Sequence, residues 1–343
     1  MSLARKLLYA AGAIALFLVI VGLLLPSTAH VSQETTIDAP AATVFALASD
    51  VHRMQEWSPW VDLPANASPQ FSGPRRGPGA SVQWKSPQSG SARLTVVEST
   101  PFRRVVMEVE RDGSKPYRSV VTLVRSGART KVMWTFDSEA GLDLLERYLR
   151  PVLTRRVRRI YELGLVSLKS MAESLPRADF GDLEIEHMVI EAAPIAYVTA
   201  SSMPAAAAIS EAMGAAFFDV LRFMDRHGLR EAGAPLSISR SFSGPRLVFD
   251  AAIPVGGMTD ATPRSGNGVR LGESYGGPVI RVTHVGSYRE LATTHEKVAA
   301  YLAAYGMEHN GDAWESYESD PARTRESELL TYVWYPVAEA LAD

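Results

Sequence analysis

Hydrophobic residues follow three different patterns in three successive regions of this 343-residue chain. Leu7 to Leu25 is an apolar run without a charge, long enough to cross a bilayer as a helix. From Val31, apolar and polar residues alternate through several short runs, and a long stretch with helical spacing follows. From Leu183, one succession of strands and a helix occurs twice. These patterns predict an α+β protein with an apolar N-terminal segment and two domains, at residues 1–30, 31–175 and 183–338.

The charges beside the apolar run predict its orientation. Arg5 and Lys6 precede it, so the positive-inside rule places the N-terminus in the cytoplasm and everything after Pro26 outside. The alternative is a cleaved signal peptide, because Ser27-Thr28-Ala29 offers the small residues of a cleavage site. Either interpretation exports both domains. We expect a single-pass membrane protein, held in the membrane by its N-terminal helix, with periplasmic C-terminal domains.

The second region has the element order of a helix-grip domain. Alternation from Val31 to Ile37 predicts a strand, and Asp38-Ala39-Pro40 opens a short helix. Five further strands and a long closing helix are expected at about residues 80–85, 92–98, 103–111, 117–126, 131–138 and 142–174. Pro151 interrupts the last pattern, so a kink or a break is expected near Arg150. A curved antiparallel sheet around one long helix accommodates these elements.

Several motifs in this region resemble those of a known family. They are Ile37-Asp38-Ala39-Pro40, Val44-Phe45, Asp50, Trp57-Ser58-Pro59-Trp60, Phe71-Ser72-Gly73 and Thr130-Lys131-Val132-Met133-Trp134. Together they resemble the polyketide cyclase/dehydrase branch of the START and Bet v 1-like (SRPBCC) superfamily. The resemblance implies an apolar cavity between sheet and long helix, with ligands that range from lipids to polyketides. Trp57 and Trp60 could line the mouth of such a cavity or pack under the loop after the first helix.

The third region contains a duplicated unit of strand, helix and two strands. Pro194 to Thr199 corresponds to Pro278 to Thr283, and the helices that follow end near Gly228 and Gly306. Such a duplicated βαββ unit usually assembles about a pseudo-twofold axis, and a ligand can bind in the groove between the copies.

The motifs of the second copy resemble those of the GyrI-like domain, the effector-binding domain attached to many AraC-type and MerR-type regulators. They are Val282-Thr283-His284-Val285-Gly286-Ser287-Tyr288, Trp314-Glu315-Ser316-Tyr317-Glu318-Ser319-Asp320-Pro321 and Leu330-Thr331-Tyr332-Val333-Trp334-Tyr335-Pro336-Val337. No helix-turn-helix unit accompanies them, and an exported domain could not reach the chromosome. The resemblance therefore implies small-molecule binding without direct transcriptional control.

Glu315 is the first candidate for a ligand-binding residue. Alternation along residues 314–319 places Glu315 and Tyr317 on one face of a strand. The family resemblance implies that this glutamate points into a central groove, where a carboxylate among aromatic rings attracts cationic or polarised ligands. Alignment of the two copies on their helix-ending glycines matches Glu315 with Ser237 and Tyr317 with Ser239, so only one copy carries the charge. The alternative is an exposed strand carboxylate. Aromatic residues that could form walls, or simply pack in the core, are Tyr288, Tyr275, Trp334 and Phe249.

Other polar candidates favour structural roles. His52 beside Asp50 suits a surface or capping position, and His284 lies at a strand end. His295-Glu296 lacks the second histidine of a zinc-protease helix, so we predict neither a metal site nor a cofactor. The arginines between residues 147 and 159 could meet anionic lipid headgroups or form a solvated helix face.

Composition limits the classes of function. The net charge of -3 argues against a nucleic-acid binder, and the absence of cysteine excludes disulfides, thiolate metal sites and cysteine nucleophiles. The leading hypothesis is a membrane-anchored, exported protein whose two domains each bind a small hydrophobic or cationic molecule, without catalysis. One alternative is a GyrI-like hydrolase of strained electrophilic molecules, with Glu315 and Tyr317 as the catalytic pair. Another is a lipid-handling module at the membrane that the second domain gates. The identity of the ligands and the oligomeric state stay open.

Overall fold

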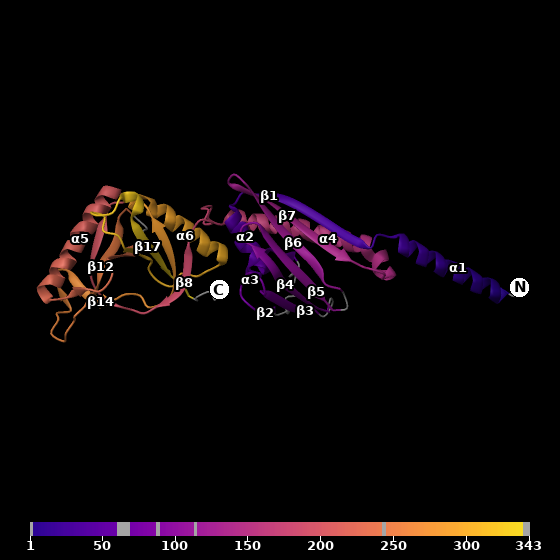
Figure 1. Cartoon of the computed structure of the whole chain (residues 1–343), viewed down its shortest axis with the longest axis horizontal. Helices are drawn as coiled ribbons and strands as arrows, with labels where there is room; N and C mark the ends of the chain where they lie inside the picture. Colours follow the sequence, from indigo (N-terminus) through magenta and orange to yellow (C-terminus); the bar gives the residue numbers. More distant parts are fainter. Residues whose placement is uncertain (1–2, 60–68, 87–89, 113–114, 242–244, 339–343) are drawn as a thin grey trace. The chain divides into compact units, whose positions relative to one another are not determined.

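The computed structural model describes residues 3–59, 69–86, 90–112, 115–241 and 245–338. The chain divides into two compact units, Met1–Gly181 and Asp182–Ala342, which we call unit 1 and unit 2 (Figure 1). Each unit combines helices with one open antiparallel sheet. The prediction of helices packed on antiparallel sheets is therefore confirmed.

The first helix, α1 (Leu3–Leu24), is apolar along nearly its whole length. Residues Arg5–Leu24 are long and apolar enough to cross a membrane, and very little of this stretch is buried within the protein. A membrane anchor and a signal sequence both have this composition near an N-terminus.

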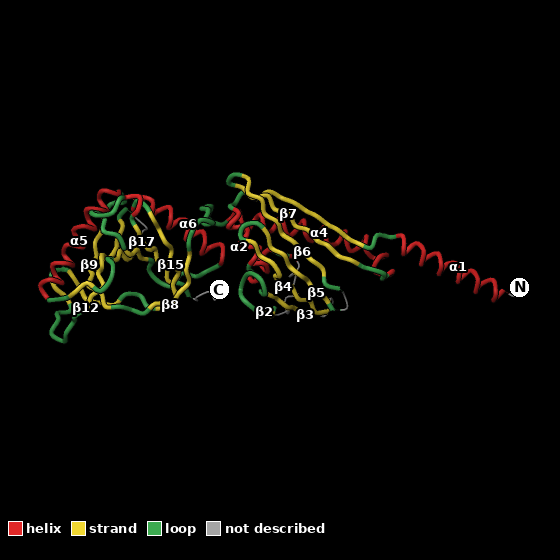
Figure 2. Tube along the Cα trace, in the orientation of Figure 1, coloured by secondary structure: helices red, strands yellow, loops and turns green. Residues whose placement is uncertain are grey.

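The sheet of unit 1 has the strand order β1-β7-β6-β5-β4-β3-β2, and every neighbouring pair is antiparallel. The long helix α4 packs along β1, and α2 and α3 contact the same helix (Figure 2). The bounds of the elements are β1 Thr28–Ile37, α2 Ala41–Ser49, α3 Val51–Trp57, β2 Gln70–Ser72, β3 Ser81–Ser86, β4 Gly90–Thr100, β5 Arg104–Arg111, β6 Tyr117–Ser126, β7 Arg129–Glu139 and α4 Leu144–Ser174.

Of the kink or break expected near Arg150, the break does not occur, because helix α4 continues through Pro151. Proline removes one backbone hydrogen bond, but the helix is held on both sides of it by packing. Arg150 is buried before the proline, and Val157 and Tyr161 are buried after it. Tertiary contacts therefore override the local signal for a break.

Aromatic side chains fill the core of unit 1 under α4. Trp134 and Tyr161 are fully buried and stack with their ring centroids 4.0 Å apart. The Trp134 indole donates to the Ser119 hydroxyl at 2.7 Å, and the Tyr161 and Ser119 hydroxyls lie 2.8 Å apart. Gly164 makes this packing possible, because a Cβ atom there would lie 2.6 Å from the Trp134 ring. The polar ends of two large aromatic residues are thus satisfied inside an otherwise apolar core.

The sheet of unit 2 has the strand order β13-β14-β9-β12-β11-β16-β17-β15-β8, with β10 paired to β12. The described elements are β8 Ile185–Ile190, β9 Pro194–Ser202, α5 Ala206–His227, β10 Arg230–Glu231, β11 Leu236–Ser241, β12 Leu247–Gly256, β13 Ser265–Gly266, β14 Val269–Glu273, β15 Gly277–Val285, a 3-10 turn Tyr288–Glu290, α6 Leu291–Tyr305, β16 Trp314–Tyr317, a 3-10 turn Glu326–Glu328 and β17 Leu330–Pro336.

The chain runs through strand, helix, strand and strand twice in unit 2, as β9-α5-β11-β12 and as β15-α6-β16-β17. Both helices end at a glycine in the left-handed conformation, Gly228 with φ 67° and Gly306 with φ 61°, which closes a helix without strain. The two halves join through β11 and β16. The strand before each half pairs with the opposite half. β8, which precedes β9 in the chain, pairs with β15, and β14, which precedes β15, pairs with β9.

Candidate functional site

Glu315 lies at the junction of the two halves of unit 2. It is the second residue of β16, and its backbone pairs with Ser237 of β11 on one side and with Val333 of β17 on the other. Alternation along the strand sends the side chains of Glu315 and Tyr317 to the same face, and the Tyr317 hydroxyl donates to the Glu315 carboxylate at 2.5 Å. The side chain of Glu315 is 16% exposed.

A histidine from α6 and a tyrosine from β17 complete a hydrogen-bonded chain around this carboxylate. His295 Nε2 lies 2.9 Å from Glu315 Oε1, and His295 Nδ1 lies 2.7 Å from the Tyr335 hydroxyl oxygen. In its ionised form the carboxylate only accepts hydrogen bonds, so Nε2 of a neutral His295 carries the proton. Nδ1 then accepts from Tyr335. Each carboxylate oxygen of Glu315 thus has one hydrogen-bonding partner, His295 at Oε1 and Tyr317 at Oε2.

The phenol groups of Tyr335, Tyr317 and Tyr288 stay protonated at physiological pH. Burial, with the Glu315 charge as a further cause, raises the pKa of Tyr335 to about 12. Burial and the charge and hydrogen bond of Glu315 raise the pKa of Tyr317 well above its ordinary value. Burial, Asp320 and Glu315 also raise the pKa of Tyr288. The tyrosines therefore act as hydrogen-bond donors or aromatic surfaces and add no charge.

Two further aromatic rings border Tyr317. The ring of Tyr288, from the turn before α6, meets it edge-on with centroids 5.3 Å apart. The ring of Phe217, from α5, lies 6.4 Å away and nearly perpendicular. Glu315, Tyr317, His295, Tyr335, Tyr288 and Phe217 form what we call the Glu315 cluster. It combines one carboxylate with aromatic rings from α5, from the 3-10 turn before α6 and from strands β16 and β17.

The other predicted wall residues lie elsewhere. Trp334 pairs with Trp314 across β16 and β17, and their rings stack 5.6 Å apart on the face opposite Glu315. Tyr275 packs against Trp314 on that same face, at 5.9 Å. Phe249 lies on the Glu315 face, but it is buried under α5 with Ala216 and Ala251. The structure thus brings Tyr317 and Tyr288 to Glu315 and places Trp334, Tyr275 and Phe249 in packing positions.

His295 and Tyr335 are the residues that sequence reasoning missed. The sequence offered a weak signal for Tyr335, because alternation places it on the opposite face of β17 from Trp334. His295 offered none, since an isolated histidine on a helix has many possible neighbours. Its approach to Glu315 follows from the way α6 packs on the sheet.

The candidate residues of unit 1 belong to its core and its helix caps. Trp57 is 3% exposed, its indole donates to the Leu47 carbonyl at 2.9 Å, and its ring meets Trp134 at 5.4 Å. Trp60 lies outside the described residues. The Trp57 side chain therefore anchors the end of α3 to α2.

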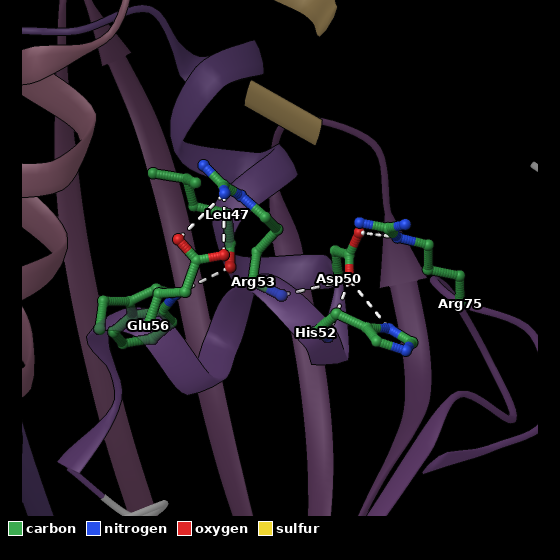
Figure 3. Close-up of polar contacts among 7 residues, drawn as sticks. Leu47, Asp50, His52, Arg53, Glu56 and Arg75 are labelled. Carbon is green, nitrogen blue, oxygen red and sulfur yellow. Dashed lines mark hydrogen bonds and ion pairs between the residues drawn. The ribbon is translucent and has the colours of Figure 1, made fainter. Parts of the chain in front are cut away.

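Asp50 is hydrogen-bonded to the polar groups around the start of α3 (Figure 3). Its fully buried carboxylate caps α3 by accepting from the backbone N–H groups of His52 and Arg53, and it accepts from Arg75 Nε at 2.7 Å. The His52 ring stacks on Phe71 at 3.8 Å, and burial lowers its pKa against the opposing effect of Asp50. This arrangement is a helix cap with a paired charge.

The remaining histidine candidate is also held by the fold. His284 is buried, with Nδ1 2.9 Å from the Thr294 hydroxyl oxygen and Nε2 3.2 Å from the Ser287 carbonyl oxygen. Within the described ranges, no group of three or more His, Cys, Asp or Glu side chains is arranged to hold a metal ion.

The model of one protein family, described as polyketide cyclase/dehydrase and lipid transport, matches residues 28–173. Residues 28–173 form a polyketide cyclase/dehydrase-type domain. This domain comprises the sheet of unit 1, α2, α3 and most of α4. The first of the two family resemblances in the sequence is therefore confirmed, and with it a fold family whose members bind ligands.

Several solved structures resemble one part of the chain each. A hydrolase from Listeria innocua is 14% identical, with 45% of this chain and 92% of that chain covered and a TM-score of 0.34. The C-terminal domain of EcmrR is 10% identical, with coverages of 46% and 99% and a TM-score of 0.38. Aha1 from Colwellia psychrerythraea is 15% identical, with coverages of 42% and 96% and a TM-score of 0.31. No curated protein matches the chain.

Proposed function

We propose that this chain is a membrane-anchored, exported protein that binds small molecules, and that unit 2 captures a cationic or polarised aromatic ligand at the Glu315 cluster. In this proposal α1 is the anchor, and residues 183–338 are a GyrI-like domain made of two βαββ copies. The polyketide cyclase/dehydrase-type domain binds a second, small hydrophobic ligand, in keeping with its family.

The observation that carries the proposal is the kind of partner that Glu315 has. A carboxylate that is mostly shielded from water is usually paired with arginine or lysine, because an unpaired buried charge is unfavourable. The partners of Glu315 are instead the imidazole of His295 and the phenol of Tyr317, and neither carries the permanent charge of an arginine or a lysine. The carboxylate oxygens thus have hydrogen-bonding partners, but no permanently charged side chain pairs with them.

A ligand cation is the natural complement of this arrangement. It would gain the attraction of the carboxylate in a partly desolvated place, where charge interactions are stronger than in water. It would also gain cation-π contact with the faces of Tyr288 and Tyr317, the two rings that border the charge. Flat aromatic cations satisfy both requirements at once.

Binding of a cationic aromatic dye to the full chain in detergent tests the proposal. Glu315→Gln keeps the size of the side chain and removes its charge, and we expect it to weaken dye binding about tenfold, equivalent to ~1.4 kcal/mol. Glu318→Gln is the matched control, because Glu318 is exposed and hydrogen-bonds to Ser316 rather than to the cluster. Equal dye affinity of the wild type and Glu315→Gln would remove Glu315 from the binding site.

A hydrolase is the second candidate, and the His295 contact favours it. A carboxylate hydrogen-bonded to an imidazole can accept a proton from water, and a neighbouring phenol can donate to an opening ring. The full chain would then turn over strained, electrophilic rings, and Glu315→Gln would abolish the turnover. Dye binding that depends on Glu315, without any turnover of these electrophiles, leaves binding as the function.

A further inference from the structure

We infer that the first half of α4 is an interfacial helix, which lies in the headgroup region of the membrane crossed by α1 and prefers anionic lipids. The inference rests on the proposed anchoring by α1. It adds a second membrane-contacting element, within the polyketide cyclase/dehydrase-type domain itself.

The end of α1 is fixed to the start of α4 by Arg147. This arginine is 8% exposed, and its Nη1 donates to the carbonyl oxygens of Gly22, Leu23 and Leu25 at 3.3, 2.9 and 3.2 Å. Gly22 and Leu23 carry two of the last carbonyls of α1, which have no partner within the helix, and Leu25 directly follows it. A cation at the C-terminus of a helix also interacts favourably with the helix dipole. Arg147 therefore caps α1 and ties it to the domain.

Close packing adds to this cap. Gly22 of α1 faces Leu144 and Tyr148 of α4, and a Cβ atom at Gly22 would lie 3.0 Å from the Leu144 side chain. The Tyr148 hydroxyl donates to the carbonyl of Leu18 at 2.6 Å. The first turn of α4 thus lies beside the last two turns of α1. If α1 spans the bilayer, this turn of α4 is at its outer boundary.

The side chains that α4 exposes at this level are apolar. Leu145, Leu149 and Val152 are 70%, 55% and 65% exposed, and Leu142 just before the helix is 81% exposed. Their spacing of three to four residues places them on one stripe of the helix. The buried residues Arg147 and Arg150 lie on the other side of the helix, and Arg150 donates to the Ser138 carbonyl of β7. A stripe of large apolar side chains beside a membrane-spanning helix fits the acyl-chain boundary of the bilayer.

One to two turns farther along α4, four basic residues follow the apolar stripe. Arg155, Arg156, Arg158 and Arg159 are all exposed. Arg156 lies about 10 Å along the helix axis from Leu149, at 1.5 Å per residue. The acidic residues at the start of α4 are engaged elsewhere: Asp143 caps the helix, and Glu146 pairs with Arg150. Apolar residues next to the anchor and cations one to two turns farther on match the succession of acyl chains and anionic headgroups.

Spin-label depth measurements on the full chain in lipid nanodiscs test the inference. The chain contains no cysteine, so single cysteines can carry a nitroxide without other changes. Leu149→Cys reports on the stripe. Val124→Cys is the control, because Val124 is 56% exposed and lies on β6 opposite Lys131, near the end of β1 that is distant from α1. Ile14→Cys, at a 61% exposed position within α1, reports on the anchor. Collisions with oxygen measure immersion in lipid, and collisions with a water-soluble nickel chelate measure exposure to water.

We expect labels at Ile14 and Leu149 to favour oxygen and the label at Val124 to favour nickel. Adding phosphatidylglycerol to phosphatidylcholine should move the Leu149 label toward oxygen, and changing the four arginines to glutamine should abolish that shift. A water-exposed Leu149 label with a lipid-immersed Ile14 label would overturn the interfacial helix alone. A water-exposed Ile14 label would overturn the anchoring as well. Spin-spin broadening at Leu149, with shielding from both reagents, would assign the stripe to contact with a second copy and overturn the inference.

Discussion

Ser237 and Glu315 are direct cross-strand partners at the centre of the unit 2 sheet, where β11 meets β16. The flanking pairs are Leu236 with Ser316 and Ile238 with Trp314. Leu236 corresponds to Trp314, and Ile238 to Ser316, under the same offset that relates Gly228 to Gly306. This pairing is what a twofold axis between Ser237 and Glu315 would produce. One half of the junction thus presents a hydroxyl where the other presents a carboxylate, and the second half supplies the charge of the cluster.

Replacing His295 by phenylalanine should destabilise the strands around Glu315. The change removes the hydrogen bond to Glu315 Oε1 and the acceptor of the Tyr335 hydroxyl, and a shielded polar group without its partner costs about 1–3 kcal/mol. Hydrogen exchange of the β16 and β17 amides measures the loss within unit 2 separately from unit 1. His309→Phe is the control, because His309 is exposed and meets Tyr335 only through its ring. Equal protection in the two variants would contradict a role for His295 in holding the cluster.

Alkaline pH should destabilise unit 2 through Tyr335. Its pKa of about 12 in the folded protein exceeds the ordinary value near 10, so the folded state holds the phenol proton more tightly than the unfolded state does. The resulting stabilisation is fully present below about pH 10 and is lost between about pH 10 and 12, with a total of about 3 kcal/mol. Tyr335→Phe should show a shallower decline of β17 protection across this range. An identical decline in both proteins would show that Tyr335 does not contribute.

Replacing Asp50 by asparagine should destabilise unit 1. The amide oxygen can still cap α3, but the charge opposite Arg75 is lost, and breaking a buried ion pair costs several kcal/mol. Because Arg75 is partly exposed, we expect about 2 kcal/mol in denaturant unfolding. Glu56→Gln, which breaks the more exposed pair with Arg53 on the same helix, should cost less than about 0.5 kcal/mol. Similar losses in both variants would mean that burial does not distinguish the two pairs.

Two glycine-to-alanine substitutions in helices should have opposite effects. At Gly164 in α4 the added methyl group would lie 2.6 Å from the Trp134 ring, and overpacking of this kind costs about 1–3 kcal/mol. At Gly214 in α5 the methyl group meets no atom within 4 Å, so the better helix propensity of alanine should stabilise the helix by about 1 kcal/mol. Thermal unfolding of the full-length variants compares the two. Stabilisation by Gly164→Ala would contradict the close fit between α4 and Trp134.

The face of a strand on which a residue lies could be read from the sequence. The side-chain period of a strand is a local property of the backbone, so Glu315 and Tyr317 were predicted to share a face, and their 2.5 Å hydrogen bond places them together. The match of Glu315 with Ser237 is equally local in origin. It depends on the number of residues between each helix-ending glycine and the strand that follows.

The neighbours that other elements bring to Glu315 were decided by tertiary structure. Trp334 was expected near Glu315, but the register of β17 against β16 places it opposite Trp314 and therefore on the other face. No sequence pattern links His295, a helix residue, to a residue of a strand. It reaches Glu315 because α6 packs over the sheet. Strand register and helix docking are set by the burial of apolar surface across the whole unit. No short stretch of sequence contains that information. A short stretch does contain the alternation of a strand and the apolar length of α1, because both are local properties.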